Sequence, residues 1–374
     1  MEVYLDRNFL DGFKYDLEGQ KSGFNNFLKF IRSLGSRIML IGNYASFGEL
    51  SEHIKSNGLA NQLFDEPITY YSIPDLLLKL DDVNFYSQGS SLKIFFVDES
   101  KARCTELENK FGYYFFSPKS LAESWSSRNN FSDEEIGRYF ITSKDTFKNE
   151  LRFDNWSKLG AIGHPLNSIV IVDKYILCDK KNQGIYYNLM QLLIELVPNC
   201  QNELPIQITI ITEKGLSDDV NEEKRLVEDR EYFKQVRKDL IYYLKDQRAY
   251  NTFNLSIIVL DKRTQRKLRE DGFEIHDRRI LTTYYWIEAG KGFNLFNDTD
   301  GLNASDSKMY FGFNANGHNI LDVEHMLEGY AKCLELSTKE NVHGSKKNRL
   351  LTHFYNRSVE KAAKATTAEK TSFA

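Results

Sequence analysis

Residues 276–279 and 290–292 carry the side chains of this sequence that are best suited to binding an anion. His276 and Arg278 are two residues apart, so both side chains leave the same face of an extended chain. A guanidinium presents a fork of donors that matches phosphate oxygens, and the imidazole beside it completes a phosphate-binding pair. Lys291 follows between two glycines, where backbone amides could approach the anion closely. The spacing predicts a phosphate site; the alternative is an ion-pair network that only fixes the turn.

The segments around this cluster predict a layered α/β domain. Period-two alternation over 280–286 follows the charges directly, which places them at a sheet end, where ligands of α/β proteins commonly bind. The apolar runs typical of strands are 168–177, 206–213, 255–261 and, as an edge strand, 308–313. The segments with helical periodicity are 184–198, 222–246 and the stretch from about 323.

These motifs occur in the order of a known family. The motif I-H-D-R-x-I, a strand with W-I and then G-K-G-F-N-x-F follow one another over 275–296, after SIVIVDKY, a helix and IQITIITE. The pattern resembles the phospholipase D-like domain at the C-terminus of MIT-domain proteins, over residues 165–315. The resemblance implies a phospholipase D-like fold that needs no cofactor and recognises acidic phospholipid headgroups. It also implies an anion pocket lined by Lys174, His276, Arg278 and Lys291.

The same resemblance predicts binding without cleavage. Active members of that superfamily use two H-x-K motifs, each followed by Asp, so that one His attacks phosphorus and the other protonates the leaving group. Here Arg278 replaces the Lys, Thr283 stands in place of the Asp, and the other half offers Asp173 and Lys174 without a histidine. One chain therefore cannot supply both imidazoles. His276 would be catalytic only in a homodimer that shares it between two protomers.

Acidic residues near the N-terminus suggest a second site. The strand-like segments there are 3–6, 37–43 and 91–100. Asp6 closes the first segment, Asp98 lies in the third, and Glu49 follows the second. This order is similar to the start and finish of PIN-type nucleases, in which acids at strand ends hold Mg²⁺ or Mn²⁺. The alternative is a structural α/β module in which Asp98 only caps a helix.

Composition limits the partners and the compartment. The chain has 374 residues and a net charge of −4, so contacts with nucleic acid or membranes depend on local patches. Its four cysteines form no C-x-x-C pair, which argues against zinc ribbons and favours reduced thiols. The N-terminus lacks signal-peptide features and no apolar run reaches about 18 residues. We therefore expect a cytoplasmic protein.

We predict an α/β protein with a mainly parallel N-terminal sheet followed by a phospholipase D-like α/β domain. The expected divisions are a 1–125 module, a 126–163 connection, a 164–340 domain and a 341–374 basic flexible tail. The predicted function is binding of phosphodiester groups, above all a nucleic-acid backbone, in a nucleic-acid-directed system such as phage defence. The alternatives are a nuclease, through N-terminal metal or a His276-sharing homodimer, and peripheral binding to acidic phospholipid headgroups.

Overall fold

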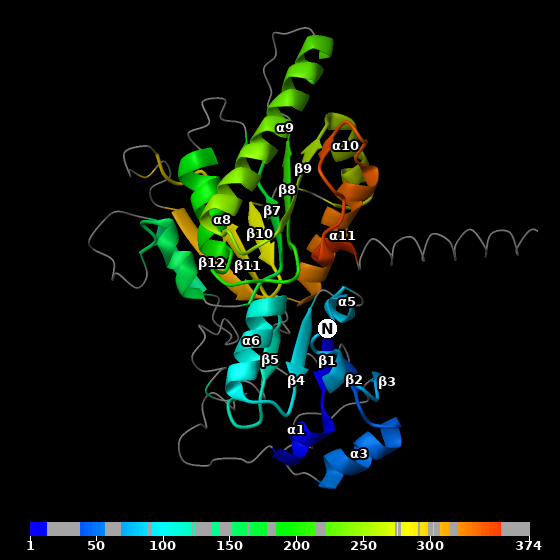
Figure 1. The fold of residues 1–374 in the computed structure, drawn as a ribbon. Coiled ribbons are helices and arrows are strands. Elements are labelled where there is room, and N and C mark those ends of the chain that lie inside the picture. The colour runs from blue at the N-terminus through cyan, green and yellow to red at the C-terminus, as the bar shows by residue number, and fades with distance from the viewer. Residues whose placement is uncertain are drawn as a thin grey trace, which may run out of the picture.

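The computed structural model contains two β-sheets with helices packed against them, so the fold class is α/β as predicted (Figure 1). The residues that the structure describes are 1–12, 38–56, 69–87, 92–121, 123, 137–141, 152–162, 165–174, 176–177, 185–213, 222–273, 275, 278–290, 292–297, 302, 307–314 and 320–352.

The N-terminal sheet has five strands, all parallel, in the order β3-β2-β1-β4-β5. The strands are β1 (Glu2–Leu5), β2 (Met39–Gly42), β3 (Thr69–Ser72), β4 (Lys93–Phe96) and β5 (Tyr114–Phe116). The helices among them are α1 (Arg7–Gly12), α3 (Phe47–Ser56), η2 (Leu77–Lys79), α5 (Val83–Tyr86) and α6 (Lys101–Phe111). The strand order runs outward from β1 on one side and from β4 on the other. The carboxyl ends of β1 and β4 therefore flank the topological switch point of the sheet, a common ligand position.

Local sequence signals explain where α6 begins and ends. The Ser100 hydroxyl accepts from the backbone N–H of Arg103 (3.1 Å) and caps α6, which ends at Gly112 with φ +66°. A side chain at Gly112 would also collide with the backbone carbonyl of Leu166, in the segment that leads into the C-terminal sheet.

The C-terminal sheet has eight strands in the order β13-β9-β8-β7-β10-β11-β12-β6. Strands β7, β8 and β9 are parallel, and the other pairs are antiparallel. The strands are β6 (Gly137–Ile141), β7 (Ser168–Val172), β8 (Ile206–Glu213), β9 (Phe253–Leu260), β10 (Arg279–Thr282), β11 (Tyr285–Ala289), β12 (Ser307–Phe313) and β13 (Val342–His343). The helices are η4 (Trp156–Ile162), η5 (Ile185–Met190), α8 (Gln191–Leu196), α9 (Glu222–Gln247), α10 (Lys262–Glu270) and α11 (Ile320–Leu336).

Helix α9 packs against the C-terminal sheet through one apolar face. Its side chains at Phe233, Val236, Leu240 and Leu244 are buried as the spacing predicts, and the helix packs along β9. Within the described ranges, no helix combines the length and the apolar content that crossing a bilayer requires.

Two parts of the C-terminal sheet come from segments expected to lie outside it. Strand β6, from the predicted connection, pairs with β12, so β12 is an inner strand and the prediction of an edge strand is wrong. Strand β13, from the predicted tail, pairs with β9. Nearby Asn348 is fully buried and its amide donates to the Ile169 carbonyl (3.0 Å) and the Thr209 hydroxyl (3.0 Å). Residues 341–352 are therefore folded onto the sheet, and 353–374 lie outside the described residues.

The two sheets meet through the turn between β10 and β11. Tyr284 in this turn is fully buried; its hydroxyl donates to the Lys93 carbonyl and accepts from the Tyr114 N–H (2.9 Å). The Asn167 amide donates to the Phe111 carbonyl (3.0 Å) beside it. These bonds connect the amino ends of β4 and β5 to the C-terminal sheet (Figure 1).

Candidate functional site

The predicted phosphate site lies where β7 and β8 end and β10 begins. Asp173 and Lys174 follow β7, Glu213 ends β8, and Arg278 precedes β10. The ladder explains their proximity, because Arg279 pairs with Val172, so the residue before one strand faces the residue after the other. Residues separated by more than one hundred positions thus share one sheet edge.

Asp173 and a tight turn form the base of this edge. Asp173 is 2% exposed, and its Oδ2 accepts a hydrogen bond from the backbone N–H of Phe293 (2.8 Å). Gly292 has φ +86°, a conformation that glycine adopts without strain. A Cβ at Gly292 would lie 2.8 Å from Asp173 Oδ2 and 3.2 Å from Arg278 Cδ. The turn after β11 therefore packs directly on both side chains, and no residue larger than glycine fits there.

The two described cations of the site are held differently. Lys174 Nζ lies 2.6 Å from Glu213 Oε2, and the Lys174 carbonyl accepts from the Thr212 hydroxyl (3.0 Å). The Glu213 carboxylate thus offsets much of the Lys174 charge. Arg278 is half-buried, and its Nη1 donates to the Gly290 carbonyl (3.0 Å). That bond orients the guanidinium beside the glycine turn.

The structure brings together Lys174 and Arg278, two of the four residues predicted to bind phosphate. The other two, His276 and Lys291, lie outside the described residues, and their roles stay predictions. Glu213, which forms an ion pair with Lys174, was not among the site residues predicted from the sequence. The signal was a single acid at the end of an otherwise uncharged strand, IQITIITE.

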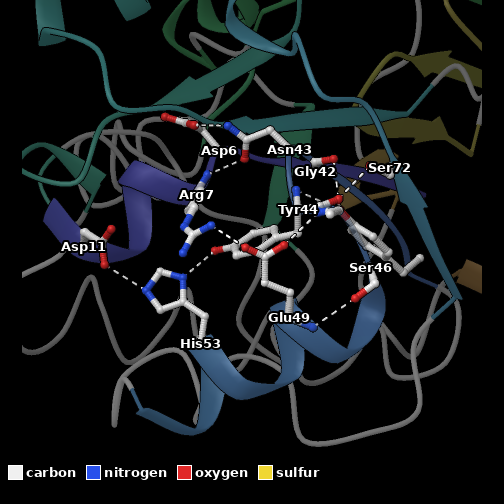
Figure 2. A network of polar contacts seen from close by, with 12 residues as sticks. Asp6, Arg7, Asp11, Gly42, Asn43, Tyr44, Ser46, Glu49, His53 and Ser72 are labelled. Carbon is white, nitrogen blue, oxygen red and sulfur yellow. Dashed lines mark hydrogen bonds and ion pairs between the residues drawn. The ribbon is translucent and has the colours of Figure 1, made fainter.

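The predicted metal site corresponds to the carboxyl edge of the N-terminal sheet (Figure 2). Asp6 is fully buried; its Oδ1 accepts from Asn43 Nδ2 (2.7 Å) and its Oδ2 from the backbone N–H of Asp98 (3.2 Å). The structure thus places Asp6 and Asp98 at the switch point between β1 and β4. Asp98 does not cap α6, since Ser100 occupies that position. The alternative reading of Asp98 as a helix cap is wrong.

Glu49, the third predicted acid, is bound by neighbouring protein groups. Its carboxylate accepts from the Ala45 N–H (2.9 Å) and forms an ion pair with Arg7 (Figure 2). The Ala45 hydrogen bond, with Arg7 beside it, lowers the pKa of Glu49. In the described part of the chain, no three His, Cys, Asp or Glu side chains are grouped closely enough to hold a metal ion. Two of the three acids, Asp6 and Glu49, already accept hydrogen bonds from protein groups.

A chain of three polar groups adjoins Glu49 (Figure 2). Asp11 Oδ1 lies 2.8 Å from His53 Nε2, and His53 Nδ1 lies 2.8 Å from the hydroxyl of buried Tyr44. Burial raises the pKa of Tyr44, so its hydroxyl stays protonated. This chain ties α1 and α3 to the loop after β2.

No protein-family model and no curated protein matches this chain. The phospholipase D-like and PIN-type resemblances therefore stay predictions. What the structure contributes is two sheet edges, one with cations around a buried aspartate and one with two aspartates at a switch point. The first edge is the predicted phosphate site, and the second is the predicted metal site.

Proposed function

We propose that the C-terminal domain binds phosphodiester groups, with the backbone of a nucleic acid as the ligand, and does not cleave them. The observation that carries this proposal is the position of Arg278 at the carboxyl edge, oriented by the Gly290 carbonyl beside the Gly292 turn. An oriented guanidinium is the side chain best matched to phosphate oxygens. The sequence adds His276 two residues before it and Lys291 between the two glycines.

Binding without hydrolysis is supported by the residues opposite Arg278. Strand β7 contains no histidine, and the residues that follow it are Asp173 and Lys174. Asp173 is already committed to the Phe293 N–H and Lys174 to Glu213. A two-imidazole mechanism of the phospholipase D type thus lacks its second group on this side.

The test measures binding of the full chain to a fluorescent single-stranded DNA by anisotropy. Arg278→Ala should weaken binding roughly 10- to 100-fold, because hydrogen bonds to charged groups contribute about 1.5–3 kcal/mol. Lys79→Ala, which removes an exposed cation from η2 in the N-terminal part of the chain, serves as the charge-matched control. Equal affinity of wild type and Arg278→Ala would contradict the proposal. Binding only to anionic lipid vesicles would favour the phospholipid alternative.

A nuclease is the second candidate, favoured by the meeting of Asp6 and Asp98 at the switch point. DNA cleavage that requires Mg²⁺ or Mn²⁺ and disappears in EDTA and in Asp6→Asn would support an N-terminal site. Cleavage that needs no metal and is lost in His276→Ala would support a homodimer sharing that histidine. If no cleavage is detected with or without metal, the binding proposal is the one that remains.

We also propose a cytoplasmic location and a role as an accessory component of a nucleic-acid-directed system. The thiols of Cys104 and Cys333 are buried and free, which agrees with a reducing compartment. Binding without cleavage suits an accessory rather than a catalytic part.

A further inference from the structure

Helix α10 carries a dense group of basic side chains that lies outside the sites predicted from the sequence. The helix has nine residues, KRTQRKLRE. Its basic side chains are all exposed; they are Lys262, Arg263, Arg266, Lys267 and Arg269. The chain as a whole has a net charge of −4, so this helix is a local exception to the overall charge.

Helical geometry places these cations on one surface, here called the α10 basic face. Positions 262, 266 and 269 follow the i, i+4, i+7 spacing, and 263 and 267 form the adjacent row. Thr264 and Leu268 are buried on the opposite side. At a rise of about 1.5 Å per residue, the face is about 10 Å long, the length of about three phosphates along one strand of a duplex.

Among the described residues, the acidic side chain that pairs with this face compensates it only weakly. Arg266 Nε lies 3.8 Å from Glu270 Oε1, with the two side chains 75% and 66% exposed. Exposed pairs of this kind contribute little and are screened by salt. The positive charge of the face is therefore available to an anionic partner.

The α10 basic face adjoins the candidate phosphate site. A small hollow between them is lined by Glu213, Gln265, Leu268, Arg269, Phe273 and Ile275. Arg269 lines this hollow together with Glu213, and Glu213 is the ion-pair partner of Lys174. In the ribbon, α10 stands at the end of β9 in the C-terminal domain (Figure 1). The hollow thus connects the α10 basic face to the sheet edge through Arg269 and Glu213.

Contacts at both ends of α10 anchor its backbone to the rest of the domain. The Asp261 carboxylate caps α10 by accepting from the Thr264 N–H (2.7 Å), and its other oxygen accepts from Asn341 Nδ2 (2.7 Å). The far end of the helix packs on α11 through Phe273, whose ring stacks on His325 (5.0 Å between centroids). Less conformational freedom is lost when such a surface binds.

We propose that the α10 basic face is a docking surface for the sugar-phosphate backbone of nucleic acid, which extends the site at Arg278. This inference rests on the proposed function and names a second group of contacts for the same ligand. A nucleic acid fits better than a membrane surface, because membrane-bound amphipathic helices insert an exposed apolar face and Leu268 of α10 is 1% exposed. A row of cations without exposed apolar side chains matches a repeating phosphate backbone instead.

The test compares two triple variants of the full chain. One is Arg263→Gln, Arg266→Gln and Lys267→Gln on α10, which leaves the hollow intact. The matched control makes the same charge change on exposed positions of α9: Lys234→Gln, Lys238→Gln and Lys245→Gln. The probe is a labelled single-stranded DNA of about 20 nucleotides, titrated from about 50 to 200 mM salt. Circular dichroism melts establish that both variants are folded.

Each phosphate contact contributes about 0.7 to the slope of log affinity against log salt for single strands, so the α10 variant should lower that slope by about 2. Its affinity at low salt should fall by at least about 10-fold, whereas the α9 variant should bind like wild type. An α10 variant with unchanged slope and affinity, while Arg278→Ala loses binding, would overturn this inference and leave the proposed function standing. Wild-type protein that binds no DNA would overturn both. Loss of binding to phosphatidylserine vesicles, with DNA binding unchanged, would also refute the assignment to nucleic acid.

Discussion

The hydroxyl of Tyr284 is the most sharply defined connection between the two sheets, and its removal tests whether they fold as one unit. Tyr284→Phe keeps the ring, which packs 4.2 Å from the Tyr114 ring centroid, and deletes only the oxygen. That oxygen accepts from the Tyr114 N–H (2.9 Å) and donates to the Lys93 carbonyl. The variant therefore isolates two hydrogen bonds between the N-terminal strands and the C-terminal domain.

The expected loss follows from leaving two buried backbone groups without this partner. Tyr284 is fully buried, so water does not replace the hydroxyl. Each hydrogen bond lost contributes about 0.5–1.5 kcal/mol, so the free energy of unfolding should fall by about 1–3 kcal/mol. The size of the change exceeds what a hydroxyl on the surface contributes.

Urea denaturation followed by far-ultraviolet circular dichroism measures this change. Tyr250→Phe is the matched control, because the Tyr250 side chain is 73% exposed and the same atom is deleted. The control should unfold within about 0.5 kcal/mol of wild type. Equal stability of Tyr284→Phe and the control would refute the shared interface between the sheets. A second transition that appears only in Tyr284→Phe would show that the hydroxyl couples two cooperative units.

Three further variants probe the described parts of the C-terminal domain. Gly292→Ala should lower the free energy of unfolding by about 1–3 kcal/mol in urea titrations, because φ is +86° and the new Cβ would lie 2.8 Å from Asp173 Oδ2. Glu213→Gln should raise DNA affinity a few-fold at low salt in the anisotropy assay, since it removes the carboxylate paired with Lys174. Burial lowers the pKa of His343, so the neutral imidazole is favoured in the folded state. Stability should be complete above the unfolded pKa of about 6.5 and should fall as pH drops below it; His343→Gln should flatten this dependence in urea titrations at pH 5 to 8.

Most strands could be predicted because each is a short apolar run with clear ends. Strand β8 coincides with the predicted 206–213, whereas β7 covers only the first five residues, SIVIV, of the predicted 168–177. Helix α6 is limited by a serine cap and a glycine, which are local signals. Neighbour relations in the sheet are not local. The sequence of β12 shows which of its faces is apolar, but nothing in it specifies that β6 completes the sheet beyond it.

The same distinction between local signals and long-range contacts applies to the candidate sites. The sequence indicates that Arg278 and Lys174 lie at strand ends, because turn residues and charges follow apolar runs there. It does not indicate that Glu213 neutralises one of them or that Arg7 engages Glu49, because those contacts depend on which strands and helices are neighbours. The α10 basic face was visible as KRTQRKLR, yet only the structure shows where that helix lies relative to Glu213.

The central claim is that the C-terminal domain recognises the charged phosphodiester backbone and leaves it intact. The most direct measurement compares two labelled single-stranded DNAs of one sequence, one with a natural backbone and one with uncharged methylphosphonate linkages. The account predicts that the full chain binds the natural strand, that log affinity falls linearly with log salt, and that the strand is recovered uncut. It predicts no measurable binding to the uncharged strand. Equal affinity for the two strands, or cleavage products from the natural strand, would contradict it.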